Sequence, residues 1–323
     1  MIRHAYGLLS KEKDLLERLQ QRLGQVHAHQ RFRMERDYED SFDGRFNFSN
    51  PEKWYSVGSV LTCALKLTGL YGLGTKNAER IQVRRNPVML ADLPPGFDGF
   101  TILHLSDLHV DMNPAAMLQM TELIATLKYD ICVLTGDFRG KVHGPFDGTL
   151  LGMAKMRSQL NGPVYGVFGN YDTVRMLAEL EAMGIRMLLN ESEPIVRGKQ
   201  RIHLAGVDDA HYYRAADLEK ATSEIPLGEF SILLSHTPEL YRQAQQHGFK
   251  LFLGGHTHGG QVCLPGSIPI TLMSSHLPRR LGAGPWTYQG MAGYTSVGVG
   301  SSVVCVRFNC PAEITLHHLH SIT

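Results

Sequence analysis

The spacing of hydrophobic and polar positions changes near the Pro94–Pro95 pair. Beyond this pair, short apolar runs alternate with stretches of helical periodicity, which is typical of an α/β protein with buried strands. The runs expected to form strands are 100–105, 131–134, 164–168, 202–207, 232–234 and 251–253. The helices expected between them are 115–127, 148–160, 174–183, 214–223 and 238–246.

The C-terminal part of the chain lacks helical periodicity. Residues 293–308 and 314–319 are rich in β-branched side chains at alternating positions, so both are expected to be antiparallel strands. We therefore expect one α/β domain over residues 91–323, preceded by a helical extension over residues 1–90.

The extension begins with an amphipathic helix. Ser10 is its expected N-cap, and Glu12 and Asp14 lie in its first turn. Its apolar positions have a heptad-like spacing: Leu9, Leu16, Leu19, Leu23 and Val26. Two heptads do not define a coiled coil, so the favoured interpretation is a helix that packs on the α/β domain.

A second apolar helix is expected over residues 54–73, after Trp54 and Tyr55. One of its faces carries Val57, Val60, Leu61, Ala64 and Thr68. Several basic residues follow it: Lys76, Arg80, Arg84 and Arg85. Packing in the protein core explains the apolar face and is favoured. Contact with acyl chains or a membrane surface, with the arginines meeting phosphates, is the alternative.

Composition excludes several classes of protein. The 323 residues include 32 Lys and Arg against 31 Asp and Glu, so no overall charge attracts nucleic acid, and no nucleic-acid partner is expected. A hydrophobic content of 43% indicates a folded protein. The 16 histidines are numerous, and imidazole is the commonest metal ligand.

The cysteines and the N-terminus bear on the compartment. The five cysteines are scattered without a C-x-x-C pair, which predicts neither a disulfide framework nor a thiolate zinc site. The N-terminus becomes charged before an apolar signal region develops, and no apolar run reaches the roughly 20 residues that span a bilayer. We expect a cytoplasmic protein, with peripheral contact at the inner face of the membrane as the alternative.

Metal-ligand residue types recur where five of the expected strands end. In chain order they are Asp107 with His109, Asp137, Asn170 with Asp172, His236, and His256 with His258. The carboxyl ends of parallel strands are where open α/β sheets place their sites, so these side chains should meet in one pocket. Carboxylates, imidazoles and an amide without thiolate suit Mn, Fe or Zn.

These blocks, written D-x-H, G-D, G-N-Y-D, a lone H and G-H-x-H, resemble the calcineurin-like metallophosphoesterase superfamily over residues 107–258. The resemblance implies a four-layer αββα sandwich and two divalent metal ions, with Mn favoured. It assigns one metal to Asp107, His109, Asp137 and His258. It assigns the other to Asp137 as the bridge, Asn170, His236 and His256. The implied reaction is phosphoester or phosphoanhydride hydrolysis by a metal-bridging hydroxide.

One position departs from the superfamily pattern. Tyr171 stands where the family places a histidine that protonates the leaving group or binds the phosphoryl oxygen, although Asp172, which would orient that histidine, is retained. A phenol with a reference pKa of about 10 is a poor acid at neutral pH. The sequence therefore predicts Asn170, Tyr171 and Asp172 as catalytic residues and a leaving group that needs little protonation, such as a phosphate.

Three further stretches narrow the resemblance. Residues 235–239, 254–266 and 307–316 resemble the bacterial branch that includes YkuE and YaeI phosphodiesterases and UDP-2,3-diacylglucosamine hydrolases. This implies a phosphorylated small-molecule or lipid-linked substrate, with Arg139 and His211 as candidate contacts. Hydrolysis of cyclic nucleotides, phosphomonoesters or phosphoproteins and a non-catalytic interaction scaffold are the alternatives. Because every ligand block is present, catalysis is favoured.

Overall fold

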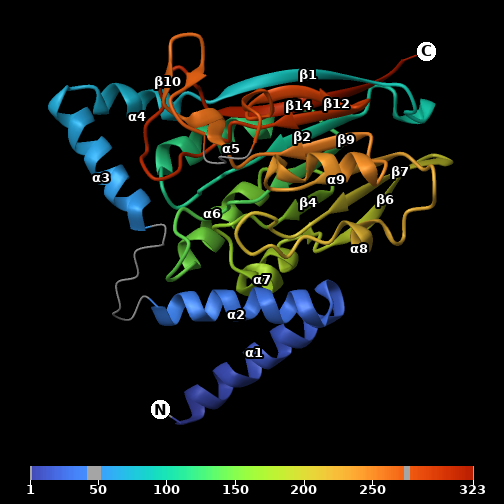
Figure 1. The fold of residues 1–323 in the computed structure, drawn as a ribbon, viewed down its shortest axis with the longest axis horizontal. Coiled ribbons are helices and arrows are strands. Elements are labelled where there is room, and N and C mark those ends of the chain that lie inside the picture. The colour runs from blue at the N-terminus through green and yellow to red at the C-terminus, as the bar shows by residue number, and fades with distance from the viewer. Residues whose placement is uncertain (1, 42–51, 273–276, 323) are drawn as a thin grey trace.

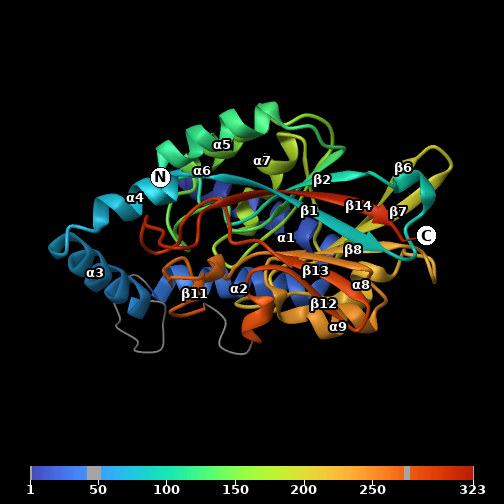
Figure 2. The same ribbon diagram turned by 90° about the horizontal axis from the view of Figure 1, so that it is seen from above.

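Two six-stranded sheets stack face to face, with helices on both outer surfaces (Figures 1 and 2). The structure is a computed structural model that describes residues 2–41, 52–272 and 277–322, without the side chains of 2–11, 37–41 and 52–58. The first sheet has the order β1 (Gln82–Leu90), β14 (Glu313–Ser321), β2 (Thr101–Leu105), β3 (Ile131–Thr135), β4 (Val164–Val167) and β5 (Ile185–Met187). The second has the order β12 (Gly284–Tyr288), β13 (Met291–Thr295), β9 (Leu251–Gly254), β8 (Ser231–Leu234), β7 (Gln200–Gly206) and β6 (Glu191–Arg197). This arrangement confirms the αββα sandwich.

The helices divide between the α/β body and the N-terminal extension. Those of the body are α5 (Pro114–Thr126), α6 (Asp147–Arg157), α7 (Leu177–Ala182), α8 (Leu218–Thr222) and α9 (Tyr241–Gln246). Those of the extension are α1 (Ile2–Leu23), α2 (Gln25–Ser41), α3 (Glu52–Leu67) and α4 (Tyr71–Glu79). A small hairpin, β10 (Cys263–Leu264) and β11 (Ile268–Pro269), follows β9 of the second sheet along the chain.

Three apolar clusters fill the three interfaces between the four layers. Leu103 and Leu105 of β2 face Met120 and Ile124 of α5 in the first cluster. Ile102 of the same strand points the other way, into the cluster between the two sheets. A third cluster joins the second sheet to α8 and α9. The central strands are therefore buried on both faces, which explains why the sequence shows them as continuous apolar runs.

Strand direction brings the polar motifs to one end of the sandwich. Strands β2, β3 and β4 are mutually parallel, and so are β8 and β9 in the other sheet. Their carboxyl ends lead directly into the segments that begin at residues 106, 136, 168, 235 and 255. The fold thus collects five separate motifs without any of them being near another in the sequence.

Two predictions about the ends of the domain differ from the structure. Residues 82–90, assigned to the helical extension, form β1, an edge strand that pairs in parallel with β14 along its whole length. Polar side chains on its outer face gave it no apolar run, which is common for edge strands. Of residues 293–308, only 293–295 belong to a strand, and 296–312 form a loop. The buried Val297 and Val299 of this loop reflect packing across the strand ends and not sheet pairing.

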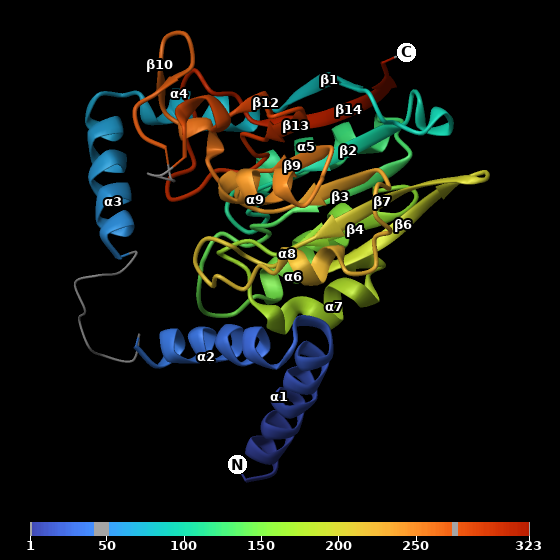
Figure 3. The same ribbon diagram turned by 45° about the vertical axis from the view of Figure 1, so that its right-hand side comes forward.

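The predicted N-terminal helix is divided into two helices, because α1 ends at Leu23 and α2 begins at Gln25. Gly24, with φ +80°, separates α1 from α2, and Val26 is 76% exposed, whereas Leu19 and Leu23 are buried against the body. Ser10 lies inside α1 and is not its cap. Figure 3 shows α1 and α2 below the body, on the side where α7 lies. The extension is thus partly built into the body.

The second predicted helix corresponds to α3 and α4. Leu61 and Leu65 pack against Val304 and Val306 of the 296–312 loop. Val60, Ala64 and Thr68 of the predicted apolar face are exposed, so the interpretation that this face packs in the core is wrong for most of it. Trp54, Tyr55 and Val57 lie outside the residues whose side chains are described. Within the described part of the chain, no helix combines the length and apolar character needed to cross a membrane.

Two fully buried histidines join the central strands of the first sheet. His104 Nδ1 lies 3.1 Å from His317 Nε2, and His104 Nε2 lies 2.8 Å from Thr135 Oγ1. Burial lowers the pKa of His104 to about 3 and holds that of His317 well below its ordinary value. Both imidazoles are therefore neutral in the folded protein across the physiological range.

This pair predicts a loss of stability in acid. The unfolded chain binds protons at these histidines below about pH 6.5, whereas in the folded chain the pKa of His104 is about 3 and that of His317 is also held well below its ordinary value, so stability decreases as the pH falls below about 6.5. We expect His317→Gln to reduce the slope of unfolding free energy against pH by about 1.4 kcal/mol per unit between pH 4 and 6. Urea unfolding of the metal-free protein measures this slope, and the exposed His247→Gln, as control, should leave it unchanged. An unaltered slope in His317→Gln would contradict the assignment.

Candidate metal centre

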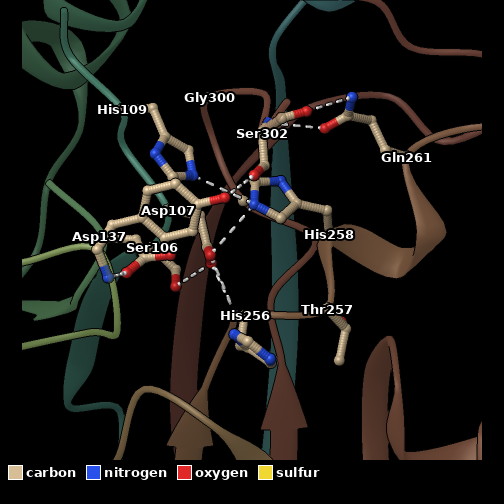
Figure 4. Close-up of polar contacts among 12 residues, drawn as sticks. Ser106, Asp107, His109, Asp137, His256, Thr257, His258, Gln261, Gly300 and Ser302 are labelled. Carbon is tan, nitrogen blue, oxygen red and sulfur yellow. Dashed lines mark hydrogen bonds and ion pairs between the residues drawn. The ribbon is translucent and has the colours of Figure 1, made fainter. Parts of the chain in front are cut away.

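The structure brings six of the predicted ligands into two buried triads, and Figure 4 labels all of the first triad together with Asp137 and His256 of the second. One triad consists of Asp107, His109 and His258, and the other of Asp137, His236 and His256. Within each triad the ligand atoms all lie within 4.8 Å of one another. Asn170 Oδ1 adjoins the second triad, because it is 3.0 Å from both His236 Nε2 and His256 Nδ1.

Most of these side chains come from strained backbone. Five of the six residues have a left-handed conformation, with φ of 51° at Asp107, 41° at His109, 55° at Asp137, 72° at His256 and 49° at His258. Non-glycine residues rarely adopt this conformation, and it is found where surrounding structure fixes it at functional sites. The His109 N–H, for example, donates to the Asp137 carbonyl at 3.0 Å. The backbone is therefore held in place for the side chains it presents.

Two glycines leave room for the carboxylates. A Cβ atom at Gly169 would collide with Asp137 Oδ1, and one at Gly255 would collide with Asp107 Oδ2 and Ser106 Oγ. Since both carboxylates are in direct contact with these glycine backbones, any side chain there would displace a ligand. The glycines in the G-N-Y-D and G-H-x-H motifs thus have a steric role.

Hydrogen bonds to carbonyl groups set the orientation of two imidazoles. His109 Nδ1 is 2.7 Å from the Arg139 carbonyl oxygen, and His236 Nδ1 is 2.7 Å from that of Thr135. A carbonyl oxygen can only accept, so in both rings Nδ1 carries a proton and Nε2 faces its triad, where it is the nitrogen that a metal ion would bind. This is how proteins usually orient histidine ligands of metals.

The second triad contains two buried groups of opposite charge, the Asp137 carboxylate and the His236 imidazolium. Burial disfavours the charged form of His236, but the Asp137 carboxylate, 3.3 Å from its Nε2, outweighs burial and raises the pKa of His236 to about 10. Burial would raise the pKa of Asp137, but the positive charge of His236 outweighs this effect and lowers that pKa to about 2. Burial lowers the pKa of His256 to about 3, so this ring stays neutral.

These residues fit two divalent cations. His256 Nδ1 and His236 Nε2 are 3.2 Å apart, and His109 Nε2 and His258 Nε2 are 3.3 Å apart, so nitrogen atoms that can act as metal ligands converge in each triad. A cation between them would relieve their repulsion and neutralise the carboxylate. Carboxylate and imidazole ligands without sulfur suit Mn, Fe or Zn.

Comparison with known proteins agrees with this geometry. The family model of the calcineurin-like phosphoesterases matches residues 100–260, which contain both triads. The chain belongs to this family. It is therefore a metal-dependent phosphoester hydrolase, as the motifs predicted.

Bacterial relatives extend the similarity along most of the chain. The uncharacterized metallophosphoesterase YkoQ of Bacillus subtilis is 26% identical over 253 residues, which are 76% of this chain and 92% of YkoQ. The uncharacterized metallophosphoesterase YkuE of the same organism is 27% identical, covering 82% of this chain and 94% of YkuE. The phosphodiesterase YaeI of Escherichia coli is 27% identical, covering 68% and 82%. These matches confirm the resemblance to the bacterial branch.

Asp172 has a different neighbourhood from the one the family pattern implied. Its carboxylate accepts the backbone N–H groups of Asp137 and Phe138, both at 2.8 Å, and of Gly169 at 2.9 Å. It therefore ties the loop that carries Asp137 to the loop that carries Asn170. In this phosphoesterase Asp172 positions two metal-ligand loops.

Tyr171 lies at the edge of the first triad. Its ring meets that of His109 edge-on, with centroids 5.3 Å apart, and its backbone N–H donates to Asp137 Oδ1 at 2.9 Å. The phenol oxygen is 3.2 Å from Ser302 Oγ. Gln261 holds Ser302 through two backbone hydrogen bonds (Figure 4). The hydroxyl is thus fixed by the 296–312 loop.

The two predicted substrate residues lie on different sides of the centre. His211 is near the second triad, with its ring centroid 4.6 Å from that of His256 and its Nδ1 3.1 Å from both oxygens of Glu239. The bond to Glu239 raises the pKa of His211. Arg139 is buried, donates to the Gly144 carbonyl at 2.9 Å, and supports His109 through its own carbonyl.

Sequence reasoning missed two buried arginines that support the centre. Arg307 donates to the carbonyls of Val297 at 2.7 Å and Gly298 at 3.2 Å, and its Nη2 lies 3.4 Å from His258 Nδ1. It fixes the loop whose Gly300 N–H donates to the Asp107 carbonyl at 2.8 Å. Arg307 lies within the 307–316 stretch used for the resemblance, but nothing local showed its partners.

The second is Arg31, on helix α2. It is fully buried, its Nη2 donates to the Asp172 carbonyl at 3.0 Å, and its Nε pairs with Asp208 Oδ2 at 3.2 Å. One turn later, Glu35 accepts from Thr173 Oγ1 at 2.6 Å and from the Val174 N–H at 3.0 Å. The N-terminal extension therefore braces the segment that follows Asn170 and Tyr171.

Proposed function

We propose that this phosphoesterase cleaves a phosphoanhydride or phosphodiester bond whose leaving group needs little protonation. The substrate class we favour is a lipid-linked or nucleotide diphosphate, of which UDP-2,3-diacylglucosamine is an example. Tyr171 is the observation that carries this proposal. The family histidine is replaced by a phenol whose hydroxyl contacts Ser302, so the position has no group that readily gives up a proton at neutral pH.

The two triads define the roles of the remaining residues. Asp107, His109 and His258 would hold one metal ion, and Asp137 with the other two histidines and Asn170 would hold the second. When bound, such a pair of cations supplies a nucleophile at neutral pH and stabilises negative charge on the phosphoryl oxygens. Among Mn, Fe and Zn, which this ligand set accepts, we propose Mn.

Groups beyond the ligands would orient the substrate. We assign His211 to a phosphoryl oxygen, because it stands beside His256 and Glu239 favours its protonated form. Tyr171 would donate a hydrogen bond at the opposite side, beside His109. Asp172 keeps both ligand loops in register without contact to the substrate.

The exchange of one side chain tests the proposal. Tyr171→His should raise kcat for an alkyl phosphomonoester by about 10- to 100-fold, since a histidine can protonate a basic leaving group. It should change hydrolysis of a nucleotide diphosphate-sugar by less than about threefold, because that leaving group needs no proton. Steady-state rates with Mn on UDP-2,3-diacylglucosamine, a cyclic nucleotide and an alkyl ester measure both effects.

The control is Tyr171→Phe, which removes the hydroxyl and keeps the ring against His109. It should retain the wild-type preference for the diphosphate. A wild-type enzyme that clearly prefers the alkyl ester, or the cyclic nucleotide, would contradict the proposed substrate class. Loss of the diphosphate activity in Tyr171→Phe would show that the phenol itself acts as the acid.

A further inference from the structure

An exposed apolar surface gathers at one end of the molecule. Its side chains come from α3, from the start of α4 and from the hairpin, and they are Val60, Leu67, Leu70, Leu73, Leu264, Ile268 and Ile270. We call this set the apolar end face. Val60 is 69% exposed and Leu67 is 83% exposed, so neither side chain is packed on the body. Figures 1 and 3 show α3, α4 and the hairpin projecting from the sandwich.

The bases of α3, α4 and the hairpin pack against one another. Leu61 and Leu65 of α3 join Tyr71 of α4, Val262 before the hairpin and Phe308 in one apolar cluster. The exposed side chains are therefore carried on a fixed base, and they are not the ends of separate loose segments. Exposed apolar patches built in this way mark interaction sites.

The charges around the apolar end face are mostly positive. Residues 59–80 contain Lys66, Lys76 and Arg80 with Glu79 as the single acid, and residues 261–272 contain no charged residue. Aliphatic side chains with cations at their margin suit an anionic lipid surface. A second copy of the chain fits less well, because a symmetric contact would bring the three cations of one copy into the same interface as those of the other.

The apolar end face lies at the same end of the sandwich as the metal centre. Helix α4 leads into β1, which is parallel to β14 and hence antiparallel to β2, so α4 is at the end where β2 delivers Asp107. One loop joins the two regions. Its Ser302 contacts Tyr171, and its Val304 packs on Leu65.

We propose that the apolar end face docks on an anionic lipid bilayer and places the metal centre beside the phosphates of lipid-linked substrates. The substrate part of this inference rests on the proposed function, whereas the docking does not. The aliphatic side chains enter the acyl region, and the cations remain among the headgroup phosphates.

Vesicle binding tests the docking on the full chain. Wild-type protein should sediment with vesicles of phosphatidylcholine containing about one-third phosphatidylglycerol, and about tenfold less with phosphatidylcholine alone. Leu70→Ser/Leu73→Ser should lower the partition coefficient about tenfold or more, because two leucine side chains that would enter the acyl region are lost from the lipid contact. Point variants are required because deletion of the extension would also remove Arg31, which supports the metal centre.

A matched control separates the face from exposed aliphatic residues in general. Leu151→Ser/Val196→Ser alters two side chains that are 66% and 65% exposed on α6 and β6, and it should bind vesicles within twofold of wild type. Both variants should hydrolyse soluble bis-para-nitrophenyl phosphate at the wild-type rate, which shows that they are folded.

The outcomes distinguish the two proposals. Absence of vesicle binding by the wild type, or equal binding by Leu70→Ser/Leu73→Ser, would overturn the docking and leave the hydrolysis unaffected. The docking would also be overturned if sedimentation velocity detected a dimer that Leu70→Ser/Leu73→Ser dissociates, because the apolar end face would then be an interface between copies. Failure of the wild type to cleave diphosphates while binding vesicles would overturn the proposed substrate and not the docking.

Discussion

Asp137→Asn is expected to lower kcat/KM for a phosphodiester by about a thousandfold or more and to abolish tight metal binding at the second triad. The carboxylate is buried, 3.3 Å from His236 Nε2, and it provides the only negative charge in its triad. An amide of the same size supplies no charge, so a divalent cation would lose its strongest ligand there. Hydrolysis of bis-para-nitrophenyl phosphate and metal content by elemental analysis measure the two effects.

The matched control is Asp92→Asn. This carboxylate pairs with Lys250 at the surface, and its side chain is 64% exposed, so the same chemical change should leave the rate within twofold. A chelator should remove the activity of both the wild type and the control, and added Mn should restore it in both. Activity that persists in Asp137→Asn at the wild-type level would mean that the second triad is not the reaction centre.

The central strands could be predicted from the sequence because strands that are buried on both faces consist of continuous apolar runs. Strands such as 131–135 and 251–254 contact apolar clusters on both sides, so they contain no polar interruption. The residues that follow these strands could be placed in one pocket because parallel strands end on the same side. This inference used only the direction of the strands, and the two triads in the structure agree with it.

The predictions failed where burial and secondary structure are not coupled. Val297 and Val299 are buried because their loop crosses the strand ends, where backbone N–H groups bond to Ser106 and Asp107 instead of a neighbouring strand. The reverse applies to β1, which is a strand with an exposed polar face. Hydrophobic periodicity reflects contact with the core and not secondary structure itself. It therefore predicts strands in buried loops and misses strands at exposed sheet edges.

The supporting groups of the site could not be predicted for a different reason. Asp172 was found from its motif, yet its three backbone partners lie in two loops that only the tertiary structure brings together. Arg31 and Glu35 stand in a charged helical stretch that is typical of a solvated helix. Their burial depends on contacts more than 130 residues away along the chain.

These distant contacts make Arg31 a sensitive position of the extension. Its guanidinium stacks 3.2 Å from the centroid of the Tyr213 ring and lies 3.5 Å from Glu35 Oε1, in addition to its ion pair with Asp208 and its hydrogen bond to the Asp172 carbonyl. Removing one partner of a buried charge pair leaves the other uncompensated. Arg31→Met should therefore lower the free energy of unfolding by about 3–5 kcal/mol, measured by urea unfolding.

The same substitution should reduce kcat by about tenfold under conditions where the variant is folded, because Asp172 and the segment after Tyr171 lose their support. Adding Asp208→Asn to Arg31→Met should restore about 1–2 kcal/mol of stability, since the orphaned carboxylate is removed, without restoring kcat. Arg18→Met, an exposed arginine on α1, should change stability by less than about 0.5 kcal/mol. If the double variant recovers both stability and kcat, Arg31 serves only to neutralise Asp208, and the brace to the metal centre is not required for catalysis.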